Sequence, residues 1–408
     1  MAIGREMRVT LVLAILLFTN IVDFMIIMPL SDLLIKDLGL SASQFSHVVA
    51  SYSISAFLSG ILVSTFIDRF DKKKLLIGIY TGFLIGTTLC GLSETYITLV
   101  GSRFLTGIFG GVMGALCFTI ISDIVPVERR STAMGYMTAA FSLASVAGVP
   151  LGLQIAAMYR WETPFFFIVG FGLLVFILVF LFIPSIPPSK ENLEGKDRFL
   201  ALRNLFTRKN QIIALSFMLL LVLGQFTVIP FITPYLTGNV GHSFEWIPLV
   251  YVVGGICTFI SSPLVGKAAD KLGRKKVFLF MALISIIPLL FQTNVLYVQD
   301  FFGEVTNPFI TLTASGLFFI FISGRMVPTN SLMTSVVSPE NRGGFMSLTS
   351  SFQQLGAGLA SLIAGWIIVV PEGEGQPIEN YGIVGLVAVG FTLLAILLSF
   401  KLKTVEGN

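Results

Sequence analysis

The chain has 408 residues, of which 55% are hydrophobic and only 12% are charged. Water-soluble domains carry about 25% charged residues, so this composition excludes an ordinary soluble protein and indicates a membrane protein. The formal net charge of +4 does not point to a nucleic-acid partner, because the cations lie in short connections between apolar segments. The three cysteines lie inside apolar runs and have neither the spacing of a metal site nor that of a disulfide framework.

Twelve apolar segments follow one another, each close to the roughly 20 residues that a helix needs to cross a bilayer. The first is too long for a cleavable signal peptide and lacks a small-residue cleavage site, so we interpret it as a span. We therefore predict an all-α membrane protein with twelve transmembrane helices. The predicted spans are 9–30, 44–67, 74–93, 96–122, 132–157, 163–183, 211–236, 246–268, 276–293, 308–335, 344–370 and 382–400.

One long polar stretch, residues 184–210, separates the sixth span from the seventh. It begins with three prolines and then becomes charged, so we interpret it as a cytoplasmic linker between two six-helix halves, residues 1–183 and 211–408. Within it, apolar residues recur at helical spacing over 199–206. This spacing suits a short helix on the membrane surface, and a disordered connector explains it equally well.

The cations predict the orientation of the chain. Lys36 and Arg160 fall on one side of the membrane, Arg103 and Arg325 lie within spans, and all others of the 26 cations fall on the opposite side. Because positively charged loops stay in the cytoplasm, both termini are predicted to be cytoplasmic. We expect a monomer in the cytoplasmic (inner) membrane of a bacterium, in contact with the lipid bilayer.

Two similar stretches connect the second and third spans of each half. The first is STFIDRFDKK over residues 64–73, and the second is GKAADKLGRK over residues 266–275. Each has a small residue, an Asp four positions later and a cationic tail, which indicates a duplicated membrane protein. Together with the twelve spans and the basic linker, this motif makes essentially the whole chain resemble the major facilitator superfamily of secondary transporters.

The resemblance implies that these turns act in gating. The second copy is intact, whereas Ser64 and Asp71 replace the two glycines of the first. A carboxylate at the inner end of a span can face a helix N-terminus or an Arg in only one conformation, so we hypothesise that Asp68 is a latch of the outward-open state. A plain stop-transfer cluster of cations is the alternative. The gating candidates are Asp68, Arg69, Lys72, Lys73, Gly266, Asp270, Gly273 and Arg274.

Asp23 lies about 14 residues into the first predicted span. An ionised carboxylate in the hydrocarbon region costs several kcal/mol, and such a residue by default marks an ion or substrate pathway. The segment resembles the first helix of bacterial drug-type proton antiporters in the same superfamily. We therefore predict that Asp23 carries protons or contacts substrate; a structural Asp that bonds the helix backbone or Asn20 is the alternative.

Arg103 lies in the fourth span, in the sequence GSRFLTG. The helix 4 motif of the superfamily, Arg-x-x-Gln-Gly, is met at Arg103 and Gly107, while Thr106 replaces the Gln. A guanidinium group inside the membrane stays charged and must find an acceptor. If Asp23 approaches it, the two form a proton-coupling pair; an Arg that snorkels to the outer headgroups is the alternative.

The fifth span contains Gly148, Pro150 and Gly152. The two glycines form a small-residue seam that permits close helix contact, and the proline between them bends the helix. In the superfamily's antiporter motif Gly and Pro are adjacent; here Val149 intervenes, as in its sugar-efflux and related drug-efflux branches. The resemblance favours export, and a generic packing seam is the alternative.

Other polar residues lie inside spans. Arg325 precedes the kinking Pro328, and it could bind an anionic or polar substrate group or lock the inner gate. The predicted substrate-binding residues are Asn20, Asp23, Gln225, Arg325 and Asn330. No phosphate-binding loop, metal-ligand cluster or catalytic motif is present in the sequence, so we predict a transporter that needs no cofactor, and not an enzyme.

We predict a proton-coupled exporter of small hydrophobic or amphipathic molecules, which includes multidrug efflux. Substrate would bind between the halves near the middle of the bilayer, and access would alternate between its two sides. A facilitator or symporter for sugars, metabolites or siderophores has the same fold and stays open. So does a membrane sensor or scaffold that does not transport. The identity of the substrate is not predicted.

Overall fold

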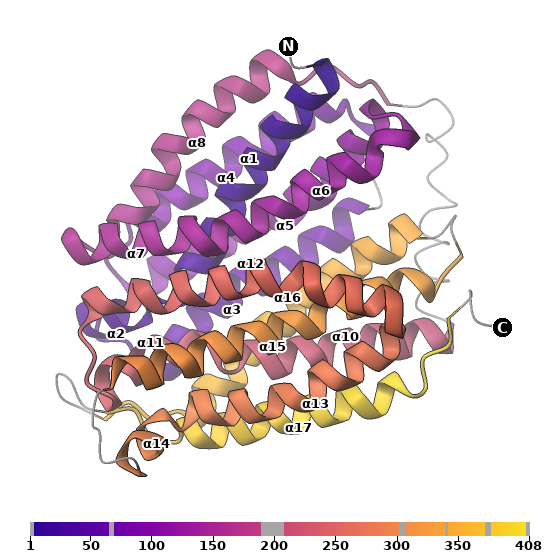
Figure 1. Ribbon diagram of the computed structural model, residues 1–408. Coiled ribbons are helices and arrows are strands. Elements are labelled where there is room, and N and C mark those ends of the chain that lie inside the picture. The colour runs from indigo at the N-terminus through magenta and orange to yellow at the C-terminus, as the bar shows by residue number, and fades with distance from the viewer. Residues whose placement is uncertain are drawn as a thin grey trace. The chain divides into compact units, whose positions relative to one another are not determined.

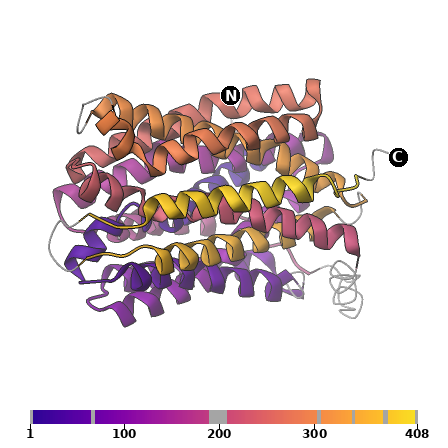
Figure 2. The ribbon, with the colours of Figure 1, turned by 90° about the horizontal axis from the view of Figure 1, so that it is seen from below.

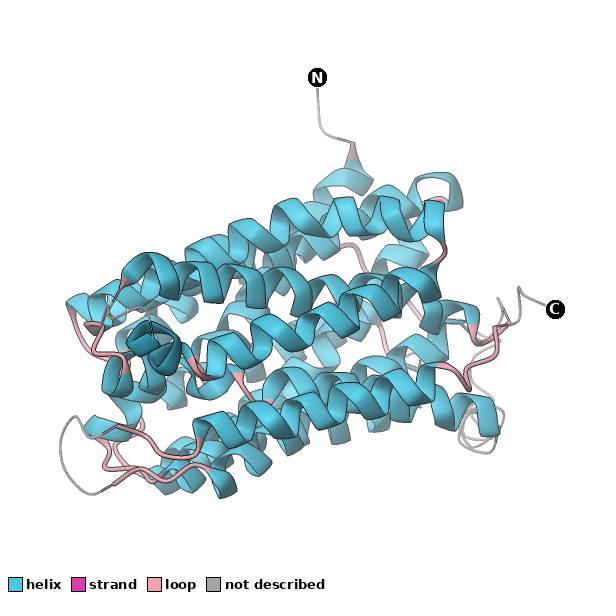
Figure 3. Ribbon diagram, turned by 60° about the horizontal axis from the view of Figure 1, so that its bottom comes forward, coloured by secondary structure: helices cyan, strands magenta, loops and turns pink. Residues whose placement is uncertain are grey.

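The computed structural model describes residues 4–64, 69–188, 208–301, 307–338, 342–371 and 377–404. Figures 1 and 3 show that the described residues are almost entirely helical. An isolated antiparallel bridge between Val369 and Glu379 is the β-structure among them. The prediction of an all-α membrane protein is therefore confirmed.

The chain divides into two compact units, residues 1–26 with 51–203 and residues 27–50 with 204–408. The boundary in the first part of the chain lies inside the helix over 42–64, between Ala50 and Ser51. Most of the predicted linker, residues 189–207, lies outside the described residues, and so does its predicted surface helix. The division into halves at 184–210 stays a prediction.

Most of the first part of the chain belongs to the first unit (Figure 1). Its helices are α1 (Arg5–Ile26), α2 (Ser31–Asp37), α3 (Ala42–Ser64), α4 (Lys72–Gly91), α5 (Tyr96–Ile124), α6 (Val127–Leu143), the π-helical turn η2 (Ala144–Gly148), α7 (Val149–Met158) and α8 (Thr163–Phe182); α2 and the start of α3 belong to the second unit. Leu13, Phe83 and Met113 are fully buried members of an apolar core formed by α1, α4, α5, α6 and α8.

The remaining helices belong to the second unit. They are α10 (Lys209–Phe226), η4 (Ile229–Phe231), α11 (Ile232–Pro234), η5 (Tyr235–Asn239), η6 (Phe244–Trp246), α12 (Ile247–Leu272), α13 (Arg274–Thr293), α14 (Val295–Phe301), α15 (Pro308–Ser335), α16 (Arg342–Ile367) and α17 (Tyr381–Ser399). Helix α17, yellow in Figure 2, packs beside α10, and the rings of Phe217 and Phe278 join α10 to α13 with centroids 5.0 Å apart.

Among the described residues, eleven helical segments are long and apolar enough to cross a membrane. Helix α16 occupies the remaining predicted span but is not one of these eleven; it carries Gln353 and Gln354 in its middle. Two predicted spans are interrupted. A π-helical turn divides the fifth, and after Phe226 the seventh breaks into short turns around Pro230 and Pro234, which lack the backbone N–H that a helix needs.

Helix starts show how local sequence positions these elements. The Thr95 hydroxyl accepts a hydrogen bond from the backbone N–H of Thr98, and the Thr98 hydroxyl accepts one from the N–H of Thr95. This reciprocal pair caps the start of α5. Asn307 caps α15 ahead of Pro308, a residue well suited to the first helical turn. These caps fix the starts of the two helices that carry Arg103 and Arg325.

Candidate functional site

Asp23 of α1 and Arg103 of α5 form an ion pair inside the first unit. Nη1 of Arg103 lies 2.8 Å from Oδ2 of Asp23, and both side chains are 0% exposed. The same nitrogen donates a longer hydrogen bond of 3.3 Å to the backbone oxygen of Asp23. Arg103 therefore points into the unit and does not snorkel to its surface, and the two residues that the sequence singled out separately lie in contact.

Thr87 of α4 completes the environment of the carboxylate. Its hydroxyl donates a hydrogen bond of 3.1 Å to Oδ1 of Asp23, so each carboxylate oxygen has one partner from a different helix. Sequence reasoning missed Thr87, because a threonine in an apolar span gives no signal of its own. Three helices, α1, α4 and α5, thus converge on one buried carboxylate.

Tyr52 of α3 covers the guanidinium group from another side. The centre of its ring lies 4.5 Å from Cζ of Arg103, within the range of a cation–π contact. Its hydroxyl accepts a hydrogen bond of 3.0 Å from Nδ2 of Asn20, one turn before Asp23 on α1. The predicted substrate-binding residue Asn20 therefore holds the aromatic ring that covers Arg103. Sequence reasoning missed Tyr52 as well.

The guanidinium group has donors to spare. Nε and Nη2 of Arg103 have no hydrogen-bond partner within the part of the chain that the structure describes. A buried charged donor without an acceptor is costly, so Arg103 has unused capacity to bind a further acceptor.

Small residues allow the helices to come this close. A methyl group added at Gly107 of α5 would collide with Ser55 and with the backbone oxygen of Tyr52, and one at Gly86 of α4 would meet the Thr106 hydroxyl at 2.5 Å. Thr106 stands where the helix 4 motif has Gln; its own hydroxyl donates to the Ser102 backbone oxygen at 2.7 Å. Thr106 therefore packs α5 against α4 and does not contact Asp23 through any described hydrogen bond.

The predicted seam of the fifth span packs against α1 near the ion pair. A methyl group at Gly148 would collide with Val22, the neighbour of Asp23, and one at Gly152 would meet Cδ1 of Ile26 at 2.7 Å. Pro150 follows the π-helical turn η2, in which the N–H of Val149 bonds to the oxygen of Ala144, five residues back. The wider turn takes up the disruption that the proline causes.

Arg325 of α15, like Arg103, is fully buried, and it lies in the other unit. Nη1 donates to the hydroxyls of Ser285 (3.3 Å) and Thr392 (2.9 Å), and Nη2 donates to the backbone oxygen of Leu221 (3.1 Å). Nε has no hydrogen-bond partner among the described residues, and no described carboxylate forms an ion pair with Arg325. Neutral oxygens therefore surround this cation, in contrast to Arg103.

The other predicted substrate-binding residues are spread through the second unit. Gln225 is half-buried near the end of α10, and its Oε1 has no described hydrogen-bond partner. Asn330 is exposed on α15, one turn after Arg325. The structure gives neither residue a hydrogen bond to Arg325.

The first predicted gating turn is described in part. Asp68 lies outside the described residues, and Arg69 is exposed. Lys72 is buried at the start of α4 and forms an ion pair with Asp123 at the end of α5. The Lys73 ammonium group donates to the backbone oxygen of Phe180 on α8 at 2.8 Å. Lys72 and Lys73 thus join helices within one unit.

In the second gating turn, Gly273 has φ +96°, a conformation that L-residues other than glycine rarely adopt, and it joins α12 to α13. Arg274 follows it and donates from Nη1 to the hydroxyl of Ser335 on α15 at 2.5 Å. Asp270 is exposed, and a methyl group added at Gly266 would have Val327 as its nearest neighbour, at 3.8 Å. No cluster of His, Cys, Asp and Glu suited to a metal ion occurs among the described residues.

Comparison with known proteins shows which family and which relatives the chain is similar to. The Major Facilitator Superfamily profile matches residues 13–228 and 215–407. The uncharacterised transporter YceJ of Bacillus subtilis is 25% identical, with 93% of this chain and 91% of that protein covered. A probable sugar efflux transporter of Helicobacter acinonychis is 24% identical, with 66% of each chain covered. Bacterial multidrug resistance proteins are also among the distant homologues.

The fold has counterparts among solved structures. The inward-facing structure of a bacterial homologue of the human lysosomal transporter Spinster has a TM-score of 0.75 and 17% identity, with 98% of both chains covered. At 17% identity the likeness shows the fold alone, and the profile match over residues 13–228 and 215–407 shows the family. The predicted resemblance is therefore confirmed, and the chain belongs to the Major Facilitator Superfamily of transporters, which are not enzymes.

Proposed function

We propose that this secondary transporter exchanges protons for small hydrophobic or amphipathic molecules and moves the latter out of the cell. The observation that carries the proposal is the buried Asp23–Arg103 pair, in which the carboxylate has two partners and two guanidinium nitrogens, Nε and Nη2, have no described hydrogen-bond partner. A carboxylate and an arginine in this setting are expensive to maintain, and such residues mark ion or substrate pathways.

The chemistry of coupling follows from the contacts of the pair. A proton on Asp23 cancels the charge that holds Nη1 of Arg103, so the guanidinium group gains a further free donor. An oxygen-bearing group of the substrate can then bind Arg103. When Asp23 loses the proton, it competes for the same guanidinium group and releases the substrate. Protons and substrate therefore alternate, which is the condition for antiport.

The direction of transport is proposed from α7 and from the relatives. The Gly148–Pro150–Gly152 seam lies against α1, beside Val22 and Ile26, so a bend in this region acts on the helix that carries Asp23. The seam resembles that of efflux branches, and the names of the distant homologues include sugar efflux and multidrug resistance proteins. These observations support export.

Substrate contacts are proposed for Asn20, Asp23, Gln225, Arg325 and Asn330. The best supported is Arg325, because its charge has no carboxylate partner among the described residues and its Nε has no acceptor. A hydroxyl, carbonyl or acidic group on the substrate would supply one. The charged turns stay gating candidates, with Asp68 as the proposed latch. Both termini are proposed to be cytoplasmic.

Reconstituted protein tests the coupling. Wild type and Asp23→Asn are placed in vesicles with an imposed pH gradient, and accumulation of a panel of lipophilic dyes and labelled sugars is followed together with internal pH. We expect gradient-driven accumulation and substrate-induced proton movement in the wild type, and loss of both in the variant. Asp32→Asn is the matched control, because Asp32 is also buried but pairs with Lys36 outside the site.

The outcomes separate the candidate functions. Accumulation that still follows the pH gradient in Asp23→Asn would show that the coupling residue lies elsewhere. Flux that ignores the gradient in the wild type would indicate a facilitator, and gradient-driven uptake in the same direction as protons would indicate a symporter. Absence of flux for the whole panel with both cation and anion gradients would favour the sensor or scaffold.

A further inference from the structure

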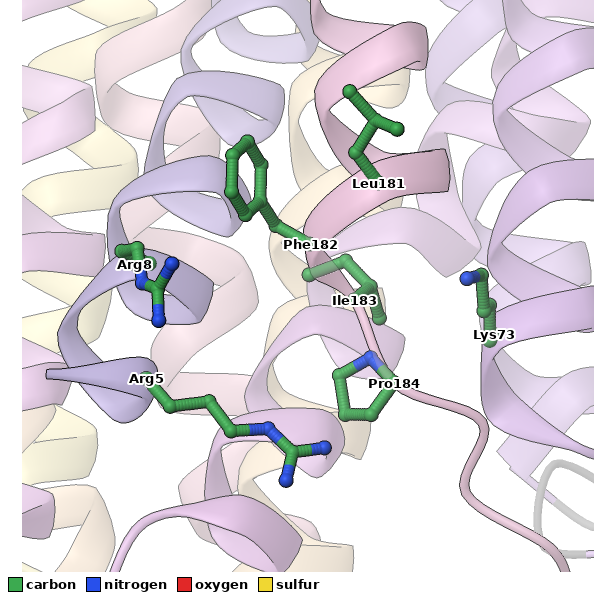
Figure 4. A pocket seen from close by; sticks show the side chains of 7 residues that line it. All are labelled: Arg5, Arg8, Lys73, Leu181, Phe182, Ile183 and Pro184. Atoms are coloured by element: carbon green, nitrogen blue, oxygen red, sulfur yellow. The ribbon is translucent and has the colours of Figure 1, made fainter.

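A cavity of about 330 Å³ opens between the ends of α1, α4 and α8, within the first unit. In the view of Figure 4, Arg5 and Arg8 lie on one side of the segment that leaves α8, and Lys73 lies on the other. The cavity is remote from the ion pair of Asp23, because it lies where the helices end. Its lining residues are Arg5, Arg8, Lys73, Leu181, Phe182, Ile183 and Pro184.

The charge of this cavity is not balanced by its own lining. Three of the lining side chains are cations, none is a carboxylate, and neither Arg5 nor Arg8 forms an ion pair with a described residue. The nearby carboxylates are engaged elsewhere. Glu6 pairs with Arg129 at 3.1 Å. Oδ1 of Asp71 accepts a hydrogen bond from the Lys74 N–H, and Oδ2 accepts one from the Ser185 hydroxyl. Guanidinium and ammonium groups gathered in this way suit a phosphate.

The wall of the cavity is held in place by specific contacts. The backbone N–H of Lys72 donates to the oxygen of Ile186 at 3.1 Å, so the segment after α8 is tied to the start of α4. The Arg8 guanidinium carbon lies 5.9 Å from the centre of the Phe182 ring, and Lys73 donates to the backbone of Phe180. Arg8 and Lys73 are therefore positioned before any ligand binds.

An apolar stripe leads away from the cavity along α8. Leu181, Ile177 and Leu174 are 65%, 53% and 60% exposed, and they follow one another at helical spacing on one face of the helix. Phe167 continues the face at the other end of α8 and is 62% exposed. A basic cavity at the membrane border that continues into an exposed apolar stripe matches the two parts of a phospholipid.

We propose that this cavity binds the phosphate-bearing headgroup of an anionic phospholipid, whose acyl chain lies along the exposed stripe of α8. Arg5 and Arg8 contact the phosphate, Lys73 contributes the third positive charge, and Leu181 with Ile177 contacts the chain. Basic cavities between membrane helices are known to recognise lipid headgroups in this way. The site is independent of the proton-coupling pair.

Lipid retention by the full-length purified protein tests the proposal. Wild type and the double variant Arg5→Gln/Arg8→Gln are compared in detergent with mixtures of phosphatidylglycerol and phosphatidylcholine, and bound lipid is measured by native mass spectrometry. We expect one phosphatidylglycerol to bind roughly 10- to 30-fold more weakly to the variant, since each cation near the membrane surface contributes on the order of a factor of five. Phosphatidylcholine binding should not change.

Two further variants separate the site from general effects. Lys401→Gln/Lys403→Gln removes the same charge from an exposed segment after α17 and should keep the lipid, whereas Arg5→Lys/Arg8→Lys should retain most of the affinity. If the glutamine variant does not fold, Leu181→Ser should still weaken the binding of phosphatidylglycerol, and it should leave the binding of free glycerol phosphate unchanged. Equal retention by wild type and by the Arg5/Arg8 or Leu181 variant would overturn the proposal, as would glycerol phosphate that displaces the lipid at equal concentration.

Discussion

Removing one member of the Asp23–Arg103 pair should destabilise the protein much more than removing both. The nitrogen and oxygen atoms of the pair are 2.8 Å apart, and neither side chain reaches the surface. Truncating one partner of a buried ion pair costs about 3–5 kcal/mol, because the other charge is left buried without compensation. We therefore expect Asp23→Leu and Arg103→Met each to lower the free energy of unfolding by about that amount.

The double variant should recover most of this loss. It replaces both charges with apolar side chains, and such replacements of a buried pair are often neutral or even stabilising. If the double variant stays within about 2 kcal/mol of the wild type, the coupling energy between the two positions is about 4 kcal/mol or more. The unused donors of Arg103 make the pair more expensive still and favour this outcome.

Equilibrium unfolding in mixed detergent micelles, followed by circular dichroism, gives the four free energies of the cycle. The pair of Asp32 and Lys36 provides the control, because its atoms lie at a similar distance of 3.0 Å while the Lys36 side chain is 45% exposed. That cycle should give only about 0.2–1 kcal/mol. Additive losses at Asp23 and Arg103, with a coupling energy below about 0.5 kcal/mol, would refute the reasoning.

Three further predictions concern the two basic turns. Asp71→Ala should destabilise the protein by about 1 kcal/mol, because Asp71 caps α4 by accepting from Lys74 N–H. Partial burial opposes ionisation of Asp71, but hydrogen bonds from Ser185 and Lys74 lower its pKa below the ordinary 3.8. The contribution of Asp71 to the free energy of unfolding is therefore complete above pH 3.8 and is lost as pH falls through the lower folded-state pKa. The difference in thermal stability between wild type and Asp71→Ala should accordingly shrink at acid pH. Gly273→Ala should cost about 1–3 kcal/mol in the same assay, because Gly273 has a positive φ. Gly266→Ala should be nearly neutral, because the added methyl group would lie 3.8 Å from Cγ1 of Val327, its nearest neighbour.

Much of the fold could be predicted because length and apolar composition alone decide whether a segment crosses a bilayer. The errors lie at polar borders and at prolines. The apolar pattern predicts the first span over 9–30, but α1 extends from Arg5 to Ile26, because charged residues continue a helix into the interface and Pro29 falls in the turn that follows. The same pattern predicts a continuous seventh span, but Pro230 and Pro234 interrupt it.

The sequence by itself determined that this is a helical membrane protein, and it singled out Asp23 and Arg103 as candidate coupling residues. Only the tertiary structure decided that the two meet, that Thr87 and Tyr52 complete their surroundings, and that Arg325 has neutral partners. The physical reason is that a membrane helix is apolar on the side that faces lipid and on the side that faces its neighbours, so its hydrophobic pattern does not fix its rotation. Close packing at small residues such as Gly107 sets that rotation, and with it the partners of each charge.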